Sequence, residues 1–103
     1  MIESFPAKQA DPGVTRQVLS HSPELMVVSF KFEEGAAGKL HNHPHIQSTY
    51  VKSGAFTFSV AGEEFVVKEG DSFVIPSNAV HGCTCTVPGE LIDTFTPRRD
   101  DFL

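Results

Sequence analysis

The sequence predicts a single all-β domain over residues 1–103, on three observations. Short stretches that alternate apolar and polar residues recur along the chain, and Gly, Pro, Asn and Asp turns separate them at intervals of about eight to twelve residues. No segment carries a helical period that competes with this reading. The 103 residues are 40% hydrophobic, which suffices for one core and leaves no room for a second. A sandwich or barrel of short strands is therefore expected.

The N-terminal third is predicted to contain an extended arm and two strands. Residues 1–13 include Pro6 and Pro12 and show no clean period, so they are expected to form an arm that can lie across a neighbouring subunit. A short strand is predicted over residues 15–20, and a turn at 22–24 leads into a strand over residues 25–32. This second strand should be half-buried, because one set of alternating positions is apolar: Met26, Val28, Phe30 and Phe32.

The remaining elements follow a predicted loop over residues 33–38. A strand is expected to run from His41 to Val51, where Ser53-Gly54 would turn the chain. Strands over residues 55–60 and 63–67 flank a tight hairpin at Ala61-Gly62. Three further strands are expected over residues 72–75, 80–87 and 90–96, with turns at 76–78 and at Pro88-Gly89.

A cluster of histidines is the strongest functional signal in the chain. The stretch from His41 to Gln47 holds three imidazoles together with the amide of Gln47 within seven residues. On an extended strand, side chains alternate between the two faces, so His41, His43 and Gln47 would project from the same face. A metal ion bound there needs a further ligand, and His81 is the only histidine later in the chain. The alternative is that these are surface histidines on an irregular loop around Pro44, but their spacing favours a metal site.

Three other residues near this cluster leave alternatives open. His45 shares the strand parity of His43, but Pro44 disturbs a strand there, so His45 is expected beside the site or at the surface rather than on the metal. Cys83 and Cys85 share the parity of His81. One of them could be a thiolate ligand, but small buried residues lining the barrel are the favoured reading, because free Cys is among the most buried residue types. Two cysteines exclude a disulfide framework.

Composition and charge exclude several classes of protein. The net charge is −5, the pI is near 5.4, and the eight basic residues are scattered, which argues against a nucleic-acid partner. The N-terminal residues lack the basic and apolar regions of a signal peptide, and no apolar run approaches the length of a membrane span. We therefore expect a cytoplasmic protein with neither nucleic-acid nor membrane partners.

Two groups of residues recur at a defined spacing: the first is Gly35, His41, His43, Gln47 and Gly54, and the second is Gly70, Pro76, Asn78 and His81. Their spacing resembles the two sequence motifs of the cupin family. The family usually has Glu where Gln47 stands, Gly where Asn78 stands and Asn where Cys85 stands. With Gln in the ligand set and a similar C-terminal tail over residues 93–103, the chain resembles in particular the KdgF cupins of pectin and alginate breakdown.

The resemblance implies a small cupin barrel, also called a double-stranded β-helix or jelly roll, with a metal ion inside it. It implies one divalent transition metal ion, with Ni, Zn, Fe, Mn and Cu not distinguished, bound by His41, His43, Gln47 and His81. The implied activity is a metal-dependent lyase or isomerase reaction that opens the ring of 4,5-unsaturated monouronates and gives linear keto-deoxyuronates.

Asp93 is the candidate acid-base residue. It shares strand parity with Leu91 and Phe95, so a carboxylate would lie on an otherwise apolar, inward face. A buried carboxylate needs a partner or a role. Asp93 is therefore expected to be either the proton-transfer group or a residue that only hydrogen-bonds to the backbone or to a ligand histidine.

The resemblance also implies that Phe95 and Arg99 line the substrate pocket. Arg99 would bind a substrate carboxylate with its planar guanidinium. The reverse assignment, with Arg98 in the pocket, stays open at this stage. Two other function classes stay open as well: an Fe-dependent cupin dioxygenase and a non-catalytic cupin that binds a sugar acid. A small-molecule sugar acid is the expected partner, and a homodimer is expected because cupin barrels have open sheet edges that pair well.

Overall fold

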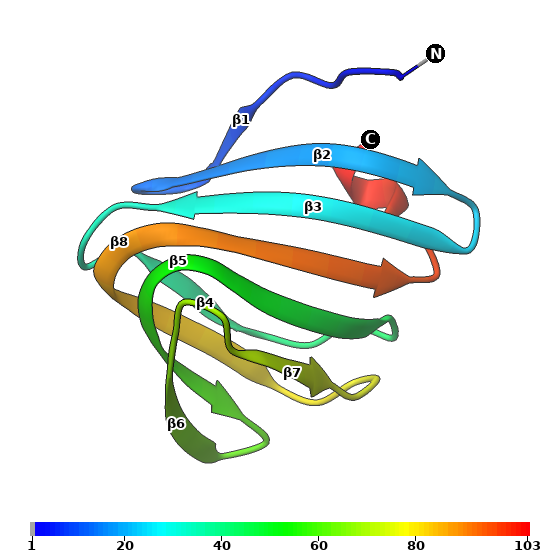
Figure 1. Cartoon of the computed structure of the whole chain (residues 1–103). Helices are drawn as coiled ribbons and strands as arrows, with labels where there is room; N and C mark the ends of the chain where they lie inside the picture. Colours follow the sequence, from blue (N-terminus) through cyan, green and yellow to red (C-terminus); the bar gives the residue numbers. More distant parts are fainter. Residues whose placement is uncertain (1) are drawn as a thin grey trace.

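The computed structural model describes residues 2–103, which form eight strands and one short 3-10 helix (Figure 1). Among these residues, no helix is both long enough and apolar enough to cross a membrane. The all-β prediction is confirmed. In chain order the elements are β1 (Lys8–Asp11), β2 (Val14–Ser22), β3 (Leu25–Phe32), β4 (Ala37–His41), β5 (Ile46–Val60), β6 (Glu63–Lys68), β7 (Ser72–Ile75), β8 (His81–Thr96) and η1 (Asp100–Phe102).

Two long strands, β5 and β8, run through both layers of the molecule and pair with each other in each layer. One layer has the order β1-β2-β3-β8-β5-β7 and uses residues 46–53 of β5 and 90–96 of β8. The other has the order β4-β8-β5-β6 and uses residues 55–60 of β5 and 81–87 of β8. Figure 1 shows both strands bending together on the left as they pass from one layer to the other. The bend therefore closes one end of a small barrel.

The bend corrects two predicted turns. Ser53-Gly54 and Pro88-Gly89 do not reverse the chain, because β5 and β8 continue through them with shifts in register. Glycine is needed where the two backbones cross. A Cβ added to Gly54 would lie 2.5 Å from the carbonyl oxygen of Val87, and one added to Gly89 would overlap the backbone of Ser53. The same residues that suggest turns therefore allow two strands to bend in contact.

The predicted strand over residues 25–32 is confirmed as β3, with Met26 and Val28 fully buried and Phe30 partly buried. Two apolar clusters fill the barrel. The first lies around the bend and contains Val14, Phe32, Val51, Phe56, Phe58, Val67, Cys85 and Leu91. The second lies toward the other end and contains Val18, Met26, Val28 and Phe95.

The predicted N-terminal arm includes a strand. Residues 8–11 form β1, which pairs antiparallel with β2 and extends one sheet by a strand. The part of this arm before β1 is also attached, because Gln17 donates a hydrogen bond from Nε2 to the carbonyl oxygen of Phe5 at 2.9 Å. The expected homodimer stays a prediction.

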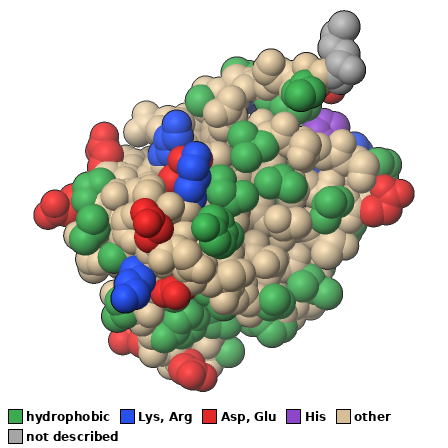
Figure 2. Space-filling model, in the orientation of Figure 1, with side chains coloured by type: hydrophobic (Ala, Val, Ile, Leu, Met, Phe, Trp, Pro, Cys, Tyr) green, Lys and Arg blue, Asp and Glu red, His purple; other side chains and the backbone are tan. Residues whose placement is uncertain are grey.

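The charged side chains on the face drawn in Figure 2 have both signs. Lys and Arg side chains lie singly or as a pair there, with acidic side chains nearby, and hydrophobic side chains are scattered between them. Within the described chain, that face carries no extended basic surface of the kind that nucleic-acid binding needs.

Candidate functional site

The three candidate histidines meet at the end of the barrel that is remote from the bend. His41 is the last residue of β4 and lies opposite His81, the first residue of β8. His43 lies in the connection between β4 and β5, and Gln47 is the second residue of β5. The expectation that His41, His43 and Gln47 share one strand is therefore wrong. The chain leaves one sheet after His41 and enters the other at Ile46, and Pro44, which lacks an N–H group, lies in the crossing segment.

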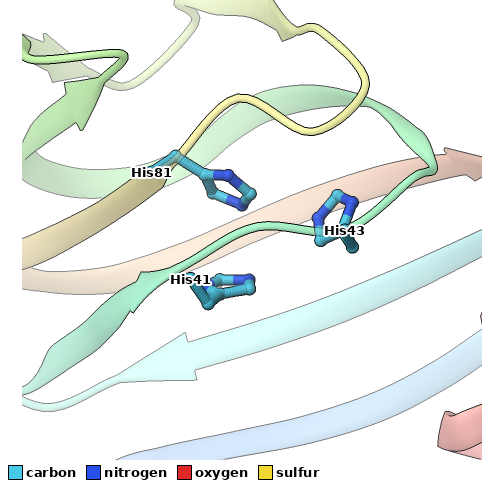
Figure 3. Close-up of side chains that lie close together, drawn as sticks. All are labelled: His41, His43 and His81. Carbon is cyan, nitrogen blue, oxygen red and sulfur yellow. The ribbon is translucent and has the colours of Figure 1, made fainter.

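The imidazole rings of His41, His43 and His81 face a common space (Figure 3). Each ring offers a nitrogen, and these three atoms lie within 4.8 Å of one another. The other ring nitrogen, Nδ1, is held by a backbone carbonyl in each case: Lys39 for His41 at 2.8 Å, His45 for His43 at 3.1 Å and Ala79 for His81 at 2.8 Å. A carbonyl oxygen can only accept, so every Nδ1 carries the proton. In neutral rings every Nε2 then presents a lone pair.

Two of these imidazoles are held in the neutral form. Burial, together with the charges of the nearby His41, His43 and Arg99, lowers the pKa of His81 to about 4, although a hydrogen bond to the Ala79 carbonyl acts to raise it. Burial, together with the charge of Arg99, also lowers the pKa of His43. Neutral imidazole is the form that binds metal ions.

The donor set fits a divalent transition metal ion. Nε2 of His81 is buried and has no hydrogen-bond partner among the described residues. A buried lone pair without a partner is costly, and a metal ion at this point would satisfy it. Imidazole nitrogens with one amide oxygen suit Zn, Ni, Cu and Fe ions. His41, His43 and His81 could therefore hold the ion that the sequence implied.

Gln47 extends this donor set from β5. Its Oε1 lies 3.1 Å from Nε2 of His43. Both atoms are acceptors when the neutral His43 ring carries its proton on Nδ1, so their approach is not a hydrogen bond. Two ligands of one ion, each bound at about 2.1 Å and separated by about 90° to 110°, lie roughly 3.0–3.4 Å apart. The spacing between Gln47 and His43 is therefore that of two ligands of one ion.

The neighbouring residues with open roles lie outside this set. The carbonyl oxygen of His45 accepts a hydrogen bond from His43, and Nδ1 of His45 is buried with no hydrogen-bond partner in residues 2–103. Cys85 belongs to the apolar core, and Cys83 packs against that core. Burial raises the pKa of Cys83 to about 12, so it is a neutral thiol rather than a thiolate. The favoured reading of the cysteines, as small residues lining the barrel, agrees with these positions.

Asp93 is buried in the barrel wall between Leu91 and Phe95, as its parity predicted. Its Oδ1 accepts a 2.7 Å hydrogen bond from the hydroxyl of Thr49, rather than from a ligand histidine or the backbone. Burial raises the pKa of Asp93 to about 7, although the hydrogen bond from Thr49, the nearby amide of Gln47 and the charge of Arg99 act to lower it. A carboxyl group that titrates near neutral pH can both accept and donate a proton.

Thr49 is a site residue that the sequence analysis missed. It is fully buried, lies two residues after Gln47 on β5 and pairs with Asp93 on β8. Gln47 donates from Nε2 to the Thr49 hydroxyl at 3.0 Å. The sequence did offer one signal, because residues 47 and 49 project from the same face of a strand. The strand register that pairs Thr49 with Asp93 is visible only in the folded chain.

Arg99, rather than Arg98, lines the cavity beside Asp93. Its guanidinium carbon lies 4.2 Å from the ring centre of Phe102 and 5.2 Å from that of Phe95. Arg99 also donates two hydrogen bonds to the carboxylate of Asp101, at 3.0 and 2.9 Å. Arg98 instead pairs with Asp100 at 2.7 Å and lies 3.3 Å from Nδ1 of His21.

One cavity of about 390 Å³ joins these groups. Such a volume accommodates a small ligand, and its wall combines aromatic and apolar side chains with a few convergent polar groups, as small-molecule sites do. Basic and acidic side chains lie on the same wall, so the cavity offers both an anchor for an anion and a proton-transfer group. The polar and aromatic wall residues that matter for chemistry are His41, Gln47, His81, Asp93, Phe95 and Arg99.

Comparisons with known proteins show which family shares this sequence and fold. The family model described as a cupin domain matches residues 28–95, which include the three histidines, Gln47 and Asp93. The pectin degradation protein KdgF of Dickeya dadantii is 38% identical, and the match covers 98% of this chain and 94% of that protein.

Two solved structures share both fold and sequence with this chain. An RmlC-like cupin from Shewanella frigidimarina is 41% identical with a TM-score of 0.92, and the match covers 96% of this chain and 89% of that one. KdgF from Halomonas sp. is 38% identical with a TM-score of 0.91, and the match covers 100% of both chains.

Proposed function

Because the chain belongs to the cupin family and to its KdgF group, we propose that it is a metal-dependent enzyme of pectin or alginate breakdown. Its reaction is the ring opening of 4,5-unsaturated monouronates to linear keto-deoxyuronates. The observation that carries this proposal is the presence, on the wall of one cavity, of ligand histidines, a buried carboxyl group and an arginine. These are a place for an electrophile, a proton-transfer group and an anchor for the substrate's carboxylate.

The metal ligands in this proposal are His41, His43, Gln47 and His81. A divalent ion bound by these four neutral side chains keeps its full charge and supplies Lewis acidity toward a ring or hydroxyl oxygen. The protein fixes the three Nε2 atoms through carbonyl contacts to every Nδ1, so the ligand geometry exists before the ion binds.

The reaction is an isomerisation, and a single carboxyl group can serve both of its proton transfers. The hydroxyl on C1 loses a proton, the bond between C1 and the ring oxygen breaks, and C1 becomes an aldehyde. The electron pair of that bond leaves with the ring oxygen, which gives an enolate across C4, C5 and this oxygen. Protonation at C4 then gives a ketone at C5. In this scheme Asp93 takes the first proton and returns one to C4, as its pKa of about 7 permits.

Arg99 and Phe95 bind the substrate in this proposal. The ring of Phe95 packs on the sugar, and the guanidinium of Arg99 binds the carboxylate at C6. Arg99 is already paired with Asp101, whose side chain is 59% exposed. The substrate's carboxylate therefore exchanges with that of Asp101, and the exchange costs little because Arg99 keeps a carboxylate partner while the exposed side chain of Asp101 returns to water.

The test is turnover of a defined unsaturated uronate. The metal-free protein is loaded in parallel with Zn, Ni, Fe, Mn or Cu ions and incubated with unsaturated galacturonate, while the absorbance of the conjugated alkene is followed against a protein-free control. We expect loss of the absorbance with at least one ion and a linear keto acid as the product. Binding of the uronate without turnover would overturn the enzyme proposal in favour of a sugar-acid-binding protein. Consumption of oxygen instead would indicate a dioxygenase.

A further inference from the structure

Three buried polar side chains form a directed chain of hydrogen bonds behind the candidate metal ligands. Gln47 donates from Nε2 to Oγ1 of Thr49 at 3.0 Å, and Thr49 donates from Oγ1 to Oδ1 of Asp93 at 2.7 Å. The exposed fractions of the three residues are 5%, 0% and 6%. Water therefore has little access to these groups, and each must find its partner within the protein.

The direction of this chain follows from the donors and acceptors available. A hydroxyl group has one proton, and Thr49 gives it to Asp93. The Thr49 oxygen can then only accept from Gln47, and the NH₂ group is the only donor of an amide side chain. This contact turns the amide so that Oε1, rather than the NH₂ group, faces Nε2 of His43 at 3.1 Å.

The orientation of the amide matters for metal binding. An amide oxygen can bind a divalent ion, whereas the NH₂ group of a neutral amide has no lone pair available for one. If the amide of Gln47 were reversed, its NH₂ group would instead donate a hydrogen bond to Nε2 of His43 and occupy the lone pair that binds the ion. Whatever holds the amide in its present orientation therefore contributes directly to metal affinity.

We propose that Thr49 is a positioning residue that directs the Gln47 carbonyl oxygen toward the metal ion and couples this ligand to Asp93. The inference rests on the proposed function, because it assumes that Gln47 is a ligand. The competing view is that Thr49 is only a buried strand residue that packs well. The two views predict different results for Thr49→Val, because valine has nearly the same shape as threonine and lacks the hydroxyl.

The experiment measures the affinity of the metal-free protein for Zn²⁺ by competition with a chelating indicator, without substrate. Thr49→Val should weaken Zn²⁺ binding by about 10- to 100-fold, the usual effect of removing a group that orients a ligand, and Thr49→Ser should restore it to within about threefold of the wild type. If Thr49 only packs, the Thr49→Val variant should bind Zn²⁺ as tightly as the wild type, and that result would overturn the proposal. Should the Thr49→Val variant not fold, Thr49→Ala is compared with Thr49→Ser instead. Both of these variants lack the methyl group, and only the second keeps the hydroxyl.

A double-mutant cycle tests whether Thr49 acts through Gln47. In a Gln47→Ala background the ligand is already lost, so adding Thr49→Val should have little further effect on Zn²⁺ affinity. An undiminished loss in that background would overturn the proposed route. The Co²⁺-loaded protein gives a second readout, because the visible absorption bands should change in Thr49→Val and persist in Thr49→Ser.

The outcomes also separate this inference from the proposed function. A wild type that binds Zn²⁺ tightly but opens no uronate ring would refute the function, and the Thr49 comparison would still be decided by the affinities. A wild type that opens the ring, with equal Zn²⁺ affinity in Thr49→Val, would refute the inference alone. A wild type without measurable affinity for Co²⁺ or for any of the Zn, Ni, Fe, Mn and Cu ions would overturn both.

Discussion

Asp93 is the only carboxylate that the described chain buries in the barrel wall, and it makes the stability of the metal-free protein depend on pH. Its pKa is about 7 in the folded protein against 3.8 for an ordinary Asp. Between these values the folded protein holds a proton that the unfolded chain has released, so the free energy of unfolding falls as pH rises through this window. The whole shift corresponds to roughly 4 kcal/mol at most.

Asp93→Asn should remove this dependence. The free energy of unfolding of the variant, minus that of the wild type, should grow as pH rises from 4 to 8, and chemical denaturation of both metal-free proteins measures it. The low pKa of His81 acts in the opposite sense, since the unfolded chain takes up that proton first, but it is common to both proteins and cancels in the difference. A difference that stays constant with pH would contradict the assigned environment of Asp93.

Gln47 is the ligand at which an added negative charge should most affect turnover of the substrate. Gln47→Glu adds a negative charge to the ligand set, and Thr49 has only one proton to share between this new carboxylate and Asp93. We expect tighter metal retention during dialysis against a chelator and slower turnover of the anionic uronate. The change in Coulomb energy at about 4 Å has an upper bound of roughly 4 kcal/mol at an effective dielectric constant near 20. An unchanged kcat and KM would show that the neutral ligand is incidental.

At the residue scale, the candidate ligands were predictable from the sequence, but the reason given for their grouping was wrong. Spacing at period two suggested one strand, whereas His41 and His43 lie on either side of a strand end and His81 completes the cluster from β8. Asp93 was predictable from strand parity. Thr49 was not, because a threonine in a strand is unremarkable until the register places it opposite Asp93, 44 residues later.

At the scale of elements, the helix η1 supplies a carboxylate that competes with the substrate for the cavity's arginine. Asp101 in η1 engages the guanidinium of Arg99, which is 12% exposed. Asp101→Asn should free Arg99 for the substrate's carboxylate and lower KM by about two- to fivefold with little change in kcat, since the competing ion pair is partly exposed. Steady-state kinetics with the unsaturated uronate measures this effect.

The neighbouring ion pair supplies a matched control. Asp100→Asn removes the partner of Arg98, which does not line the cavity, so KM should not change. Arg99→Ala should raise KM. A higher KM in Asp101→Asn would show instead that Asp101 orients Arg99 for binding.

The shared bend of β5 and β8 is the element on which the barrel depends. Gly89→Ala would drive a Cβ into the Ser53 backbone, which cannot move without disturbing the pairing of β5 and β8. We expect a loss of roughly 2–3 kcal/mol in the free energy of unfolding, the upper range for overpacking. Gly62→Ala is the control: it has open space and a φ of +84°, so it should cost only about 1–2 kcal/mol of backbone strain. Equal losses in thermal denaturation would show that the crossing is not tightly packed.

The bend also shows which feature of the strands could not be predicted from the sequence. Alternating residues located nearly every strand, because one face of each is apolar. Gly54 and Gly89 signalled a break in regular structure, but a turn and a bend in contact with another strand use the same residue type. Only the pairing of distant segments distinguishes the two.

At the scale of the whole molecule, the barrel brings distant segments to one cavity. Three Nε2 atoms come from the ends of β4 and β8 and the loop after β4, while Asp93 and Arg99 come from the end of β8 and the residues beyond it. In the proposed reaction these groups act together. The carboxyl group of Asp93 moves protons during ring opening, beside a metal ion that His41, His43, Gln47 and His81 would bind.

The most direct test compares ring-opening rates of the wild type and Asp93→Asn at saturating metal and substrate, with metal content measured in both. The asparagine oxygen can still accept the Thr49 proton, so metal binding should persist, while loss of the acid-base group should slow ring opening by about 10²- to 10⁴-fold. A slower rate with equal metal content is the predicted result. Equal rates in the two proteins would contradict the account.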